Sequence, residues 1–548
     1  MTLTQRLYAI GIMLFLWYVS LVFAPQLCLL LNMPISSWQF ALSLLIFISF
    51  SWVFHRNYFG ISQKRQFGIN FLISLGLFLL CLLFAGSIYD TSFDGTWYHL
   101  DAVHLLKNGW NPSYKMLSEE ETSYCSKYLN HFPKVPWIYA ALVAKVTGNV
   151  EMGKAANLQL IISCLFVAQH MGRAIFKLSA LLSWILAFLI ASNPIQILNL
   201  GSFYVDGQVS SLTFLGMAFA IYQVVEGGWV KGFLALLAFA LLANIKFPSA
   251  FYAILYVGAF LGFLWFTKAY KWQKMLTIAL FWGVFTFGVL GWNPYMSNLI
   301  RMGHPLYPLS EGTEKVFKKE ENYPANFLNT NRFERFFRSF YAEPKWARNP
   351  ETSDLKTLFS HVPLYTYDYG VPDLAGFGPF TPEVFLLLFP LGLWVLFELK
   401  GKERKNAVFI LSVLLIATFI NPEAWVMRYV PQFWIFLVIL VLLVLQRVKW
   451  QGPGFVLAVG LLLNNLTLLN QNIVKSYVHT SELKEQLNEV ATSNGKIEFY
   501  PGWAKSFQYR LTDVGLDLQK QTYIPETDTS ANKFTGGLGA LYRKRKTE

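Results

Sequence analysis

The sequence predicts an all-α polytopic membrane protein, and two observations support this fold class. Hydrophobic residues make up 54% of the 548 residues and charged residues only 14%, whereas about a quarter of the residues in a soluble domain are charged. The apolar residues also gather into long runs, and a helix needs roughly 20 such residues to cross a bilayer. We therefore expect a bundle of transmembrane helices.

About thirteen apolar runs are candidate spans by this length criterion. In chain order they lie at 7–31, 39–54, 69–88, 155–172, 180–199, 208–225, 231–247, 249–267, 275–292, 384–399, 406–422, 432–447 and 453–469. Lysine and arginine are concentrated in the connections near 56–65, 173–177, 268–274, 400–405 and 447–449. The positive-inside rule places these connections in the cytoplasm, so we expect the extracytoplasmic segments to be 89–154, 200–207, 293–383 and 421–431.

These patterns divide the chain into five regions. They are an N-terminal helix pair (1–68), a transmembrane module (69–292) with the outer loop 89–154, an extracytoplasmic loop region (293–383), the C-terminal transmembrane helices (384–469) and a small soluble C-terminal α/β domain (470–548). Short mixed patterns such as Lys496-Ile-Glu-Phe-Tyr500 predict the last region.

Two short helices are expected inside the outer loop 89–154. The stretch from Pro136 to Val146 is apolar but only about a dozen residues long, which is too short to span a bilayer. We expect it to lie along the outer membrane interface as an amphipathic or juxtamembrane helix. The second helix runs from Trp97 to Lys107 and is ended by Asn108-Gly109.

The formal charge of +13 does not indicate nucleic-acid binding, because an excess of Lys and Arg in a membrane protein mainly marks its cytoplasmic loops. Cys28, Cys81 and Cys164 lie in apolar runs, so neither a disulfide framework nor a cysteine-based metal site is expected. The lack of disulfides and of a glycosylation pattern favours a bacterial inner membrane as the location.

The first candidate site residues follow the apolar run that ends at Ile88. Carboxylates at the mouth of a membrane helix are costly, so Asp90 and Asp94 predict a function. Asp94 is a candidate catalytic base, or else an N-cap for the helix near Trp97. Asp90 is either functional or simply ends the preceding helix. His99 is an interfacial ring, an acid–base group or a ligand.

Further unusual polar residues lie near the outer ends of other spans: Tyr204, Asp206, Lys246, Arg301, His304, Glu423 and Arg428. Asp206 has helix capping as its alternative role, and Lys246 could extend to the headgroups instead of holding a phosphate. Arg428 could bind phosphate oxygens bidentately. Together these groups can deprotonate an acceptor and hold a phosphate leaving group. No Gly-rich phosphate loop is present, so a lipid phosphate is expected rather than a nucleotide.

The order of these features resembles the GT-C superfamily of integral-membrane glycosyltransferases, which includes protein O-mannosyltransferases and aminoarabinose transferases. From about residue 69, the resemblance rests on Asp94-Gly-Thr-Trp-Tyr-His99, Asp206, Asn244-Ile-Lys246-Phe-Pro248, Gly303-His-Pro-Leu-Tyr-Pro308 and Arg428-Tyr-Val-Pro431. It implies a helical bundle with an outer active site, a polyprenyl-phosphate-linked sugar as donor and inversion at the anomeric carbon.

The same resemblance implies roles for individual residues. Asp94 would be the general base on an acceptor hydroxyl, Asp206 would help to position it, and Lys246 and Arg428 would bind the donor phosphate. The motif departs from the adjacent acidic pair of many members, because Gly95 follows Asp94. It stays open whether Asp90 or Asp101 replaces the second carboxylate, and whether a divalent metal is bound.

Two other functions are compatible with the sequence. A transporter or flippase of a lipid-linked sugar would place charges near the middle of several spans, with matched helix breaks in two halves. A non-catalytic membrane assembly subunit would not need both acids and cations. The expected partners are the donor, membrane lipids and a lipid-, glycan- or protein-linked acceptor. The sugar, the acceptor and the oligomeric state are left open.

Overall fold

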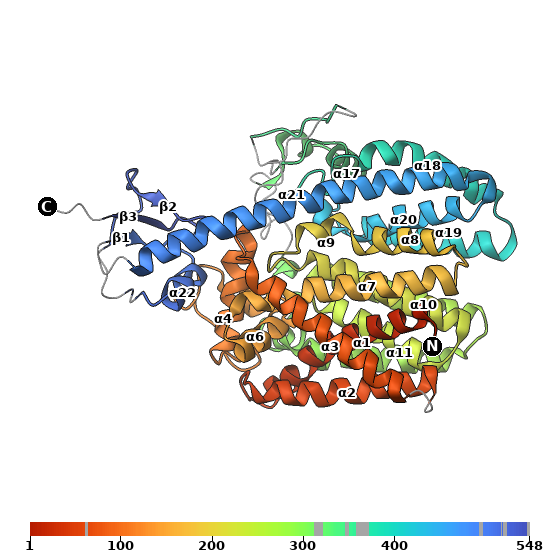
Figure 1. Cartoon of the computed structure of the whole chain (residues 1–548), viewed down its shortest axis with the longest axis horizontal. Helices are drawn as coiled ribbons and strands as arrows, with labels where there is room; N and C mark the ends of the chain where they lie inside the picture. Colours follow the sequence, from red (N-terminus) through yellow and green to blue (C-terminus); the bar gives the residue numbers. More distant parts are fainter. Residues whose placement is uncertain are drawn as a thin grey trace.

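The computed structural model is predominantly helical, with long helices that run side by side along the long axis of the molecule (Figure 1). A small domain that contains the C-terminus projects from one end (Figure 1). The structure describes residues 1–60, 64–311, 322–345, 350–357, 372–492, 497–516, 518 and 523–544.

Nine helices within these described ranges are long and apolar enough to cross a membrane. They are α1 (Leu3–Leu30), α2 (Trp38–Phe59), α3 (Lys64–Ser87), η3 with α7 (Val150–Ala174), α10 (Asp206–Glu226), α12 (Phe247–Phe266), α13 with η4 (Trp272–Leu290), α18 (Thr381–Glu398) and α21 (Gln451–Thr492). The membrane character predicted from composition is thereby supported.

The predicted count of about thirteen spans is not confirmed. Every predicted run falls on a helix, but three of these helices are short, namely α8 (Ala180–Ala191), α11 (Trp229–Ala243) and α20 (Gln432–Leu445). The run 180–199 contains a break, because Asn193 caps the separate helix α9 (Pro194–Leu198) through its side chain. Helix α19 (Gly401–Phe419) begins with charged residues, which leaves a short apolar part.

Helix α1 lies inside the bundle and packs against α7, α2, α6 and α3. Of the residues in its most apolar 18-residue stretch, 89% are buried. Gly11 allows close contact with α7, because an added Cβ would lie 3.1 Å from the carbonyl oxygen of Ser163. The Ser163 hydroxyl also donates to the Gly11 carbonyl at 2.7 Å. The N-terminal pair 1–68, separated in the sequence analysis, therefore packs as part of the bundle.

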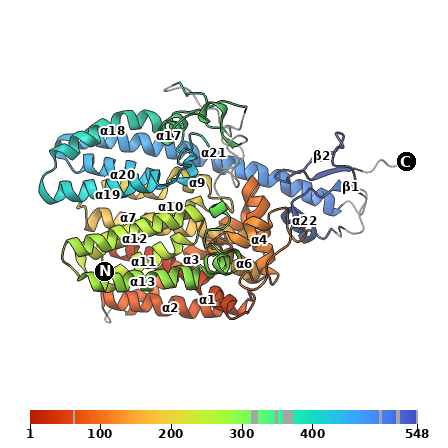
Figure 2. The same cartoon turned by 180° about the vertical axis from the view of Figure 1, so that it is seen from behind.

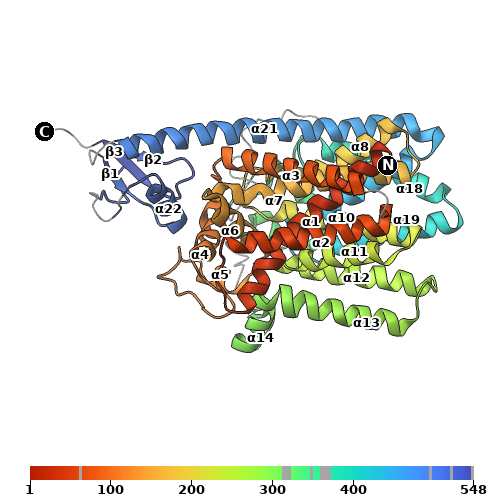
Figure 3. The ribbon, with the colours of Figure 1, turned by 60° about the horizontal axis from the view of Figure 1, so that its bottom comes forward.

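The two ends of the bundle differ in chemistry. The basic connections α7–α8, α18–α19 and α20–α21 meet at one end, where Lys177, Glu403 and Arg447 line a common cavity. The N-terminus lies at this end too (Figure 2). The opposite end carries the short helices α4 (Leu100–Lys107), α5 (Ser126–His131), α6 (Val135–Thr147) and α14 (Ser297–Met302) (Figure 3).

The two short helices expected in the outer loop 89–154 are both present. Helix α4 continues the π-helical turn η2 (Gly95–His99), so Gly95 to Lys107 forms one helical segment. Helix α6 begins at Val135, but Val135 to Ala144 are all buried. It is therefore packed within the protein and does not lie as an amphipathic helix with one exposed face on the membrane surface.

Only parts of the predicted loop region 293–383 belong to the described residues, because 312–321, 346–349 and 358–371 lie outside them. The described parts form η5 (Trp292–Met296), α14, η6 (Leu309–Glu311), η7 (Ala325–Phe327) and α17 (Arg332–Phe340). Tyr323, Phe327 and Leu374 pack with Trp425 in a separate apolar cluster. This cluster ties the region to the segment that carries η9 (Met427–Tyr429).

The C-terminal domain contains a small antiparallel sheet, as the sequence predicts. Its strands are β1 (Ile497–Tyr500), β2 (Asn532–Lys533) and β3 (Leu541–Lys544), in the order β1-β3-β2, and α22 (Lys505–Asp513) packs beside them. Helix α21 runs across the predicted boundary at 470 without interruption and contributes Leu483, Leu487 and Val490 to the domain core. Lys496 lies outside the described residues.

Candidate functional site

A cavity of about 540 Å³ lies where segments distant in the sequence meet. It is lined by Asp94, Tyr98 and His99, by Tyr204 to Asp206, by Ile245 to Pro248, by His304, Leu306 and Leu309, by Ile420 to Glu423, and by Arg428 and Tyr429, among others. All predicted site residues except Asp90 and Arg301 therefore reach one cavity.

The Asp94 carboxylate faces this cavity and forms an ion pair with Arg428. Its Oδ2 lies 3.1 Å from Arg428 Nη1. Although Asp94 occupies the N-cap position of η2, its side chain makes no capping hydrogen bond, so the capping alternative is not realised. The Arg428 side chain is 9% exposed, and its guanidinium group lies 5.3 Å from the ring centres of both Tyr204 and Tyr429.

A second acid and cation form a direct ion pair at the wall of the same cavity. Lys246 donates to Asp206 Oδ1, and its amine lies 4.3 Å from the ring centre of Tyr429. Asp206 is the first residue of α10 and is not its N-cap. Only 15% of the Lys246 side chain is exposed, so it does not extend to the headgroups. Burial lowers the pKa of Lys246, and Asp206 opposes this effect.

His99 is a neutral hydrogen-bonding group in this cavity. The Trp137 indole donates to His99 Nδ1 at 2.7 Å, so the ring proton of the neutral form lies on Nε2. Burial lowers the pKa of His99 to about 3. At neutral pH the ring therefore provides an N–H donor and no positive charge for a phosphate.

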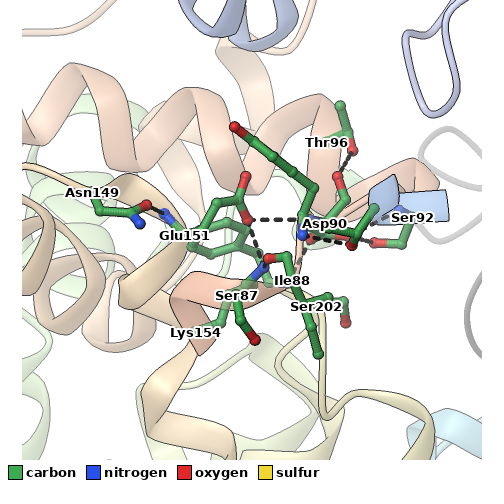
Figure 4. Close-up of polar contacts among 12 residues, drawn as sticks. Ser87, Ile88, Asp90, Ser92, Thr96, Asn149, Glu151, Lys154 and Ser202 are labelled. Carbon is green, nitrogen blue, oxygen red and sulfur yellow. Dashed lines mark hydrogen bonds and ion pairs between the residues drawn. The ribbon is translucent and has the colours of Figure 1, made fainter. Parts of the chain in front are cut away.

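Asp90 does not line the cavity. It holds the segment that carries Asp94 in place instead. Its side chain is buried and accepts a hydrogen bond from Ser92 N at 2.8 Å (Figure 4). It also accepts a hydrogen bond from Phe203 N at 2.6 Å. Burial raises its pKa. A Cβ on Gly95 would lie 2.1 Å from Asp90 Oδ2, so only glycine fits beside Asp94.

Asp101 does not supply the second cavity carboxylate either. It is buried under the outer loop and accepts from Ser123 N at 3.2 Å and from the Cys125 thiol at 3.5 Å. Burial raises its pKa to about 6. The carboxylates nearest to the two cavity cations are thus Asp94 and Asp206, with Asp373 Oδ1 at 3.8 Å from Arg428 Nε.

Arg301 and His304 differ in position. Arg301 is exposed and donates to the Ser113 carbonyl oxygen at 2.9 Å, away from the cavity. His304 lies at the cavity rim, where its Nδ1 accepts from Leu306 N at 3.1 Å. Of this predicted pair, only His304 can contact a molecule in the cavity.

Several residues of the site were missed in the sequence analysis. Tyr429 contacts both cations, and its position directly after Arg428 was the available signal. Asp373 lies in an irregular segment without any periodic pattern. Glu423 was noted but not selected. It lines the cavity and is held by the Tyr323 hydroxyl at 2.5 Å and the Trp425 indole at 2.7 Å.

One side of the cavity is apolar, formed by Phe247, Phe251, Leu306, Leu309 and Ile420. Phe251 is 41% exposed and Ile420 is 44% exposed. They lie on or next to α12 and α19, whose outer faces are apolar, so this side of the cavity borders the surface that a bilayer would cover.

No group of three or more His, Cys, Asp or Glu side chains suited to a metal ion occurs within the described parts of the chain. No protein-family model matches the chain, and neither a curated protein nor a solved structure matches it. The geometry of the cavity is therefore the basis for assigning a function.

Proposed function

We propose that this protein is a membrane glycosyltransferase of the GT-C type. It moves a sugar from a polyprenyl-phosphate-linked donor to an acceptor hydroxyl on the extracytoplasmic face, with inversion. One observation carries the proposal: a single cavity combines two acid–cation pairs, Asp94–Arg428 and Asp206–Lys246, with an apolar side next to the membrane. The apolar side suits an isoprenoid chain, and the cations suit its phosphate.

Both cations are available to one phosphate group. Lys246 and Arg428 both line the cavity and both contact the Tyr429 ring, which supports a shared role in binding one anion. Guanidinium groups bind phosphate oxygens bidentately, which favours exchange of the Asp94–Arg428 pair for a phosphate–Arg428 pair. Donor binding would then free the Asp94 carboxylate. The base is released only when the donor is in place.

The chemistry follows from this exchange. Asp94 accepts the proton of the acceptor hydroxyl while the oxygen attacks the anomeric carbon. The bond from that carbon to the phosphate oxygen breaks, and its electron pair leaves on the lipid phosphate. Arg428 and Lys246 stabilise the charge that develops there. The His99 Nε2–H can donate a hydrogen bond to the sugar. Attack opposite the leaving group inverts the configuration.

The charge distribution supports an extracytoplasmic site. The basic connections gather at the end opposite α4 and α6, and the positive-inside rule assigns basic connections to the cytoplasm. The cavity, next to α4 and α6, then faces outward. We place the protein in a bacterial inner membrane, as the cysteine usage favours.

The test is sugar transfer from a radiolabelled polyprenyl-phosphate sugar by purified protein in lipid, with a panel of acceptors. Asp94→Asn should lower turnover about 10²- to 10⁴-fold, the range for loss of a general base. Asp528→Asn is a matched control, because Asp528 pairs with Arg543 at 2.5 Å in the C-terminal domain. This control should keep full turnover.

Unchanged turnover in Asp94→Asn would remove Asp94 from the role of base. Donor binding by the wild type without transfer to any acceptor would instead support a transporter or flippase. A wild type that neither binds the donor nor transfers the sugar would contradict both functions.

A further inference from the structure

The C-terminal domain packs directly on the segment that carries Asp94. In α22, the Ser506 hydroxyl donates to the Thr96 carbonyl oxygen, and Lys505 N donates to the Ser123 hydroxyl at 2.6 Å. Trp503 lies 5.7 Å from the Trp97 ring. The helical turn that follows Asp94 is therefore held from its outer side by this domain.

Next to these contacts lies a buried group of four charged residues, Asp90, Glu151, Lys154 and Arg510, which we call the buried quartet. Arg510 Nη2 pairs with Glu151 Oε1, and Lys154 Nζ lies 2.5 Å from Glu151 Oε2. Each of the four residues is at most 3% exposed. Two acids and two bases balance, as buried charges require. Figure 4 shows the Glu151 carboxylate facing Lys154 and the backbone of Asp90.

The quartet is joined to the cavity by backbone contacts. Glu151 Oε2 accepts from the backbone N of Asp90 at 3.1 Å, and Lys154 donates to the Ile88 carbonyl oxygen. The Asp90 carboxylate in turn binds Phe203 N, one residue before Tyr204 in the cavity. The contacts that start at Arg510 thus reach both the segment that carries Asp94 and the segment that carries Asp206.

We propose that Arg510 is a positioning residue for catalysis, which fixes Asp94 through Glu151 and the backbone of Asp90. This inference rests on the proposed function, in which Asp94 is the base. Removal of Arg510 leaves a net negative charge among three buried groups, so Glu151 must move or draw water in. Movement of Glu151 releases the Asp90 backbone, and a small displacement of a catalytic group lowers the rate strongly.

The experiment compares three variants: Arg510→Met, Arg510→Lys and the control Lys505→Met. The control removes a cation from the same helix, where the Lys505 amine donates to the Glu120 carbonyl oxygen in the outer loop. Two readouts are measured at matched folded fraction: amide hydrogen exchange in residues 90–99, and the kcat and donor KM of transfer.

Arg510→Met should raise exchange in 90–99 and lower kcat about tenfold or more, with a donor KM within about threefold of the wild type. Arg510→Lys keeps the charge, so its exchange in 90–99 and its kcat should both lie close to the wild-type values. Lys505→Met should change neither exchange nor kcat. Unchanged exchange and kcat in folded Arg510→Met would overturn the proposal. So would a rise in KM that accounts for the whole loss of kcat/KM.

Two further results keep the test decisive. If Arg510→Met does not fold, the charge-balanced Arg510→Met/Glu151→Gln variant replaces it, and wild-type exchange in 90–99 in this double variant would overturn the proposal. If the wild type transfers no sugar, the proposed function fails, whereas the exchange readout still decides whether Arg510 holds the acidic segment.

Discussion

The cavity and the buried quartet contain the same kinds of charged groups in different surroundings. In the cavity, Asp94 is 17% exposed and Lys246 is 15% exposed, and each pairs with one main partner. In the quartet, Glu151 accepts from Arg510, Lys154 and the Asp90 backbone, and no member is more than 3% exposed. The cavity pairs can therefore exchange partners with a ligand, whereas the quartet is fixed.

The largest difference between the two groups is expected in catalysis. Arg428→Gln removes the cation that would bind the leaving phosphate, so kcat/KM for sugar transfer should fall about 10²- to 10³-fold. The melting temperature should fall less than in a quartet variant, because the partly exposed Asp94 can be hydrated and the contact with Asp373 is longer, at 3.8 Å. Steady-state transfer and thermal unfolding measure the two effects. A loss of folding that matches the loss of activity would show that Arg428, like the buried quartet, is needed for stability.

The quartet should show the opposite response. Glu151→Gln leaves Arg510 and Lys154 with one carboxylate, and removal of one partner from a buried pair costs about 3 kcal/mol or more. The free energy of unfolding, followed by denaturant titration in detergent, should fall by about that amount. A variant as stable as the wild type would show that the quartet is hydrated and exchangeable.

A smaller effect is expected at the contact between the two regions. Gly95→Ala places a Cβ against Asp90 and Ser92, and overpacking of this kind costs about 1–3 kcal/mol. Gly258→Ala in α12 is the matched control, because nothing lies within 4 Å of the added Cβ. Thermal unfolding should separate the two variants. Equal melting temperatures would contradict the close contact of Gly95 with Asp90.

The last effect concerns the pH dependence of stability. Because the pKa of His99 is lowered to about 3, the unfolded chain takes up a proton near pH 6.5 that the folded protein does not. Stability contributed by neutral His99 is therefore present above that pH and is lost as the pH falls from about 6.5 towards 3. His99→Asn should flatten the decline of the melting temperature between pH 6.5 and 4.5. An equal decline of the melting temperature with pH in both proteins would show that His99 is charged in the folded protein.

The sequence predicted much of the cavity because its charges stand out against apolar surroundings. Asp94, Asp206, Lys246 and Arg428 lie at the ends of apolar runs, where a charge needs an explanation. Glu151 and Lys154 lie in the outer loop just before the run 155–172, and Arg510 lies in the polar C-terminal region, so no pattern links the three. Only the tertiary structure shows that they meet.

The positions of the helices were predictable, but the number of helices long enough to cross the membrane was not. Apolar runs include residues that end helices, as Asn193 and Pro194 do after α8, and residues buried in the protein rather than facing lipid, as in α20. Hydropathy does not distinguish these cases. The roles of Asp90 and Gly95 also depend on one contact that no linear pattern encodes.

The most direct test of partner exchange in the cavity is the affinity for polyprenyl phosphate in lipid nanodiscs, for the wild type and Asp94→Asn. If phosphate and Asp94 compete for Arg428, the variant should bind about three- to tenfold more tightly, which corresponds to about 1 kcal/mol for one partly exposed ion pair. Added salt should reduce the binding of both proteins. Equal or weaker binding by Asp94→Asn would contradict the exchange of ion pairs on which the proposed mechanism rests.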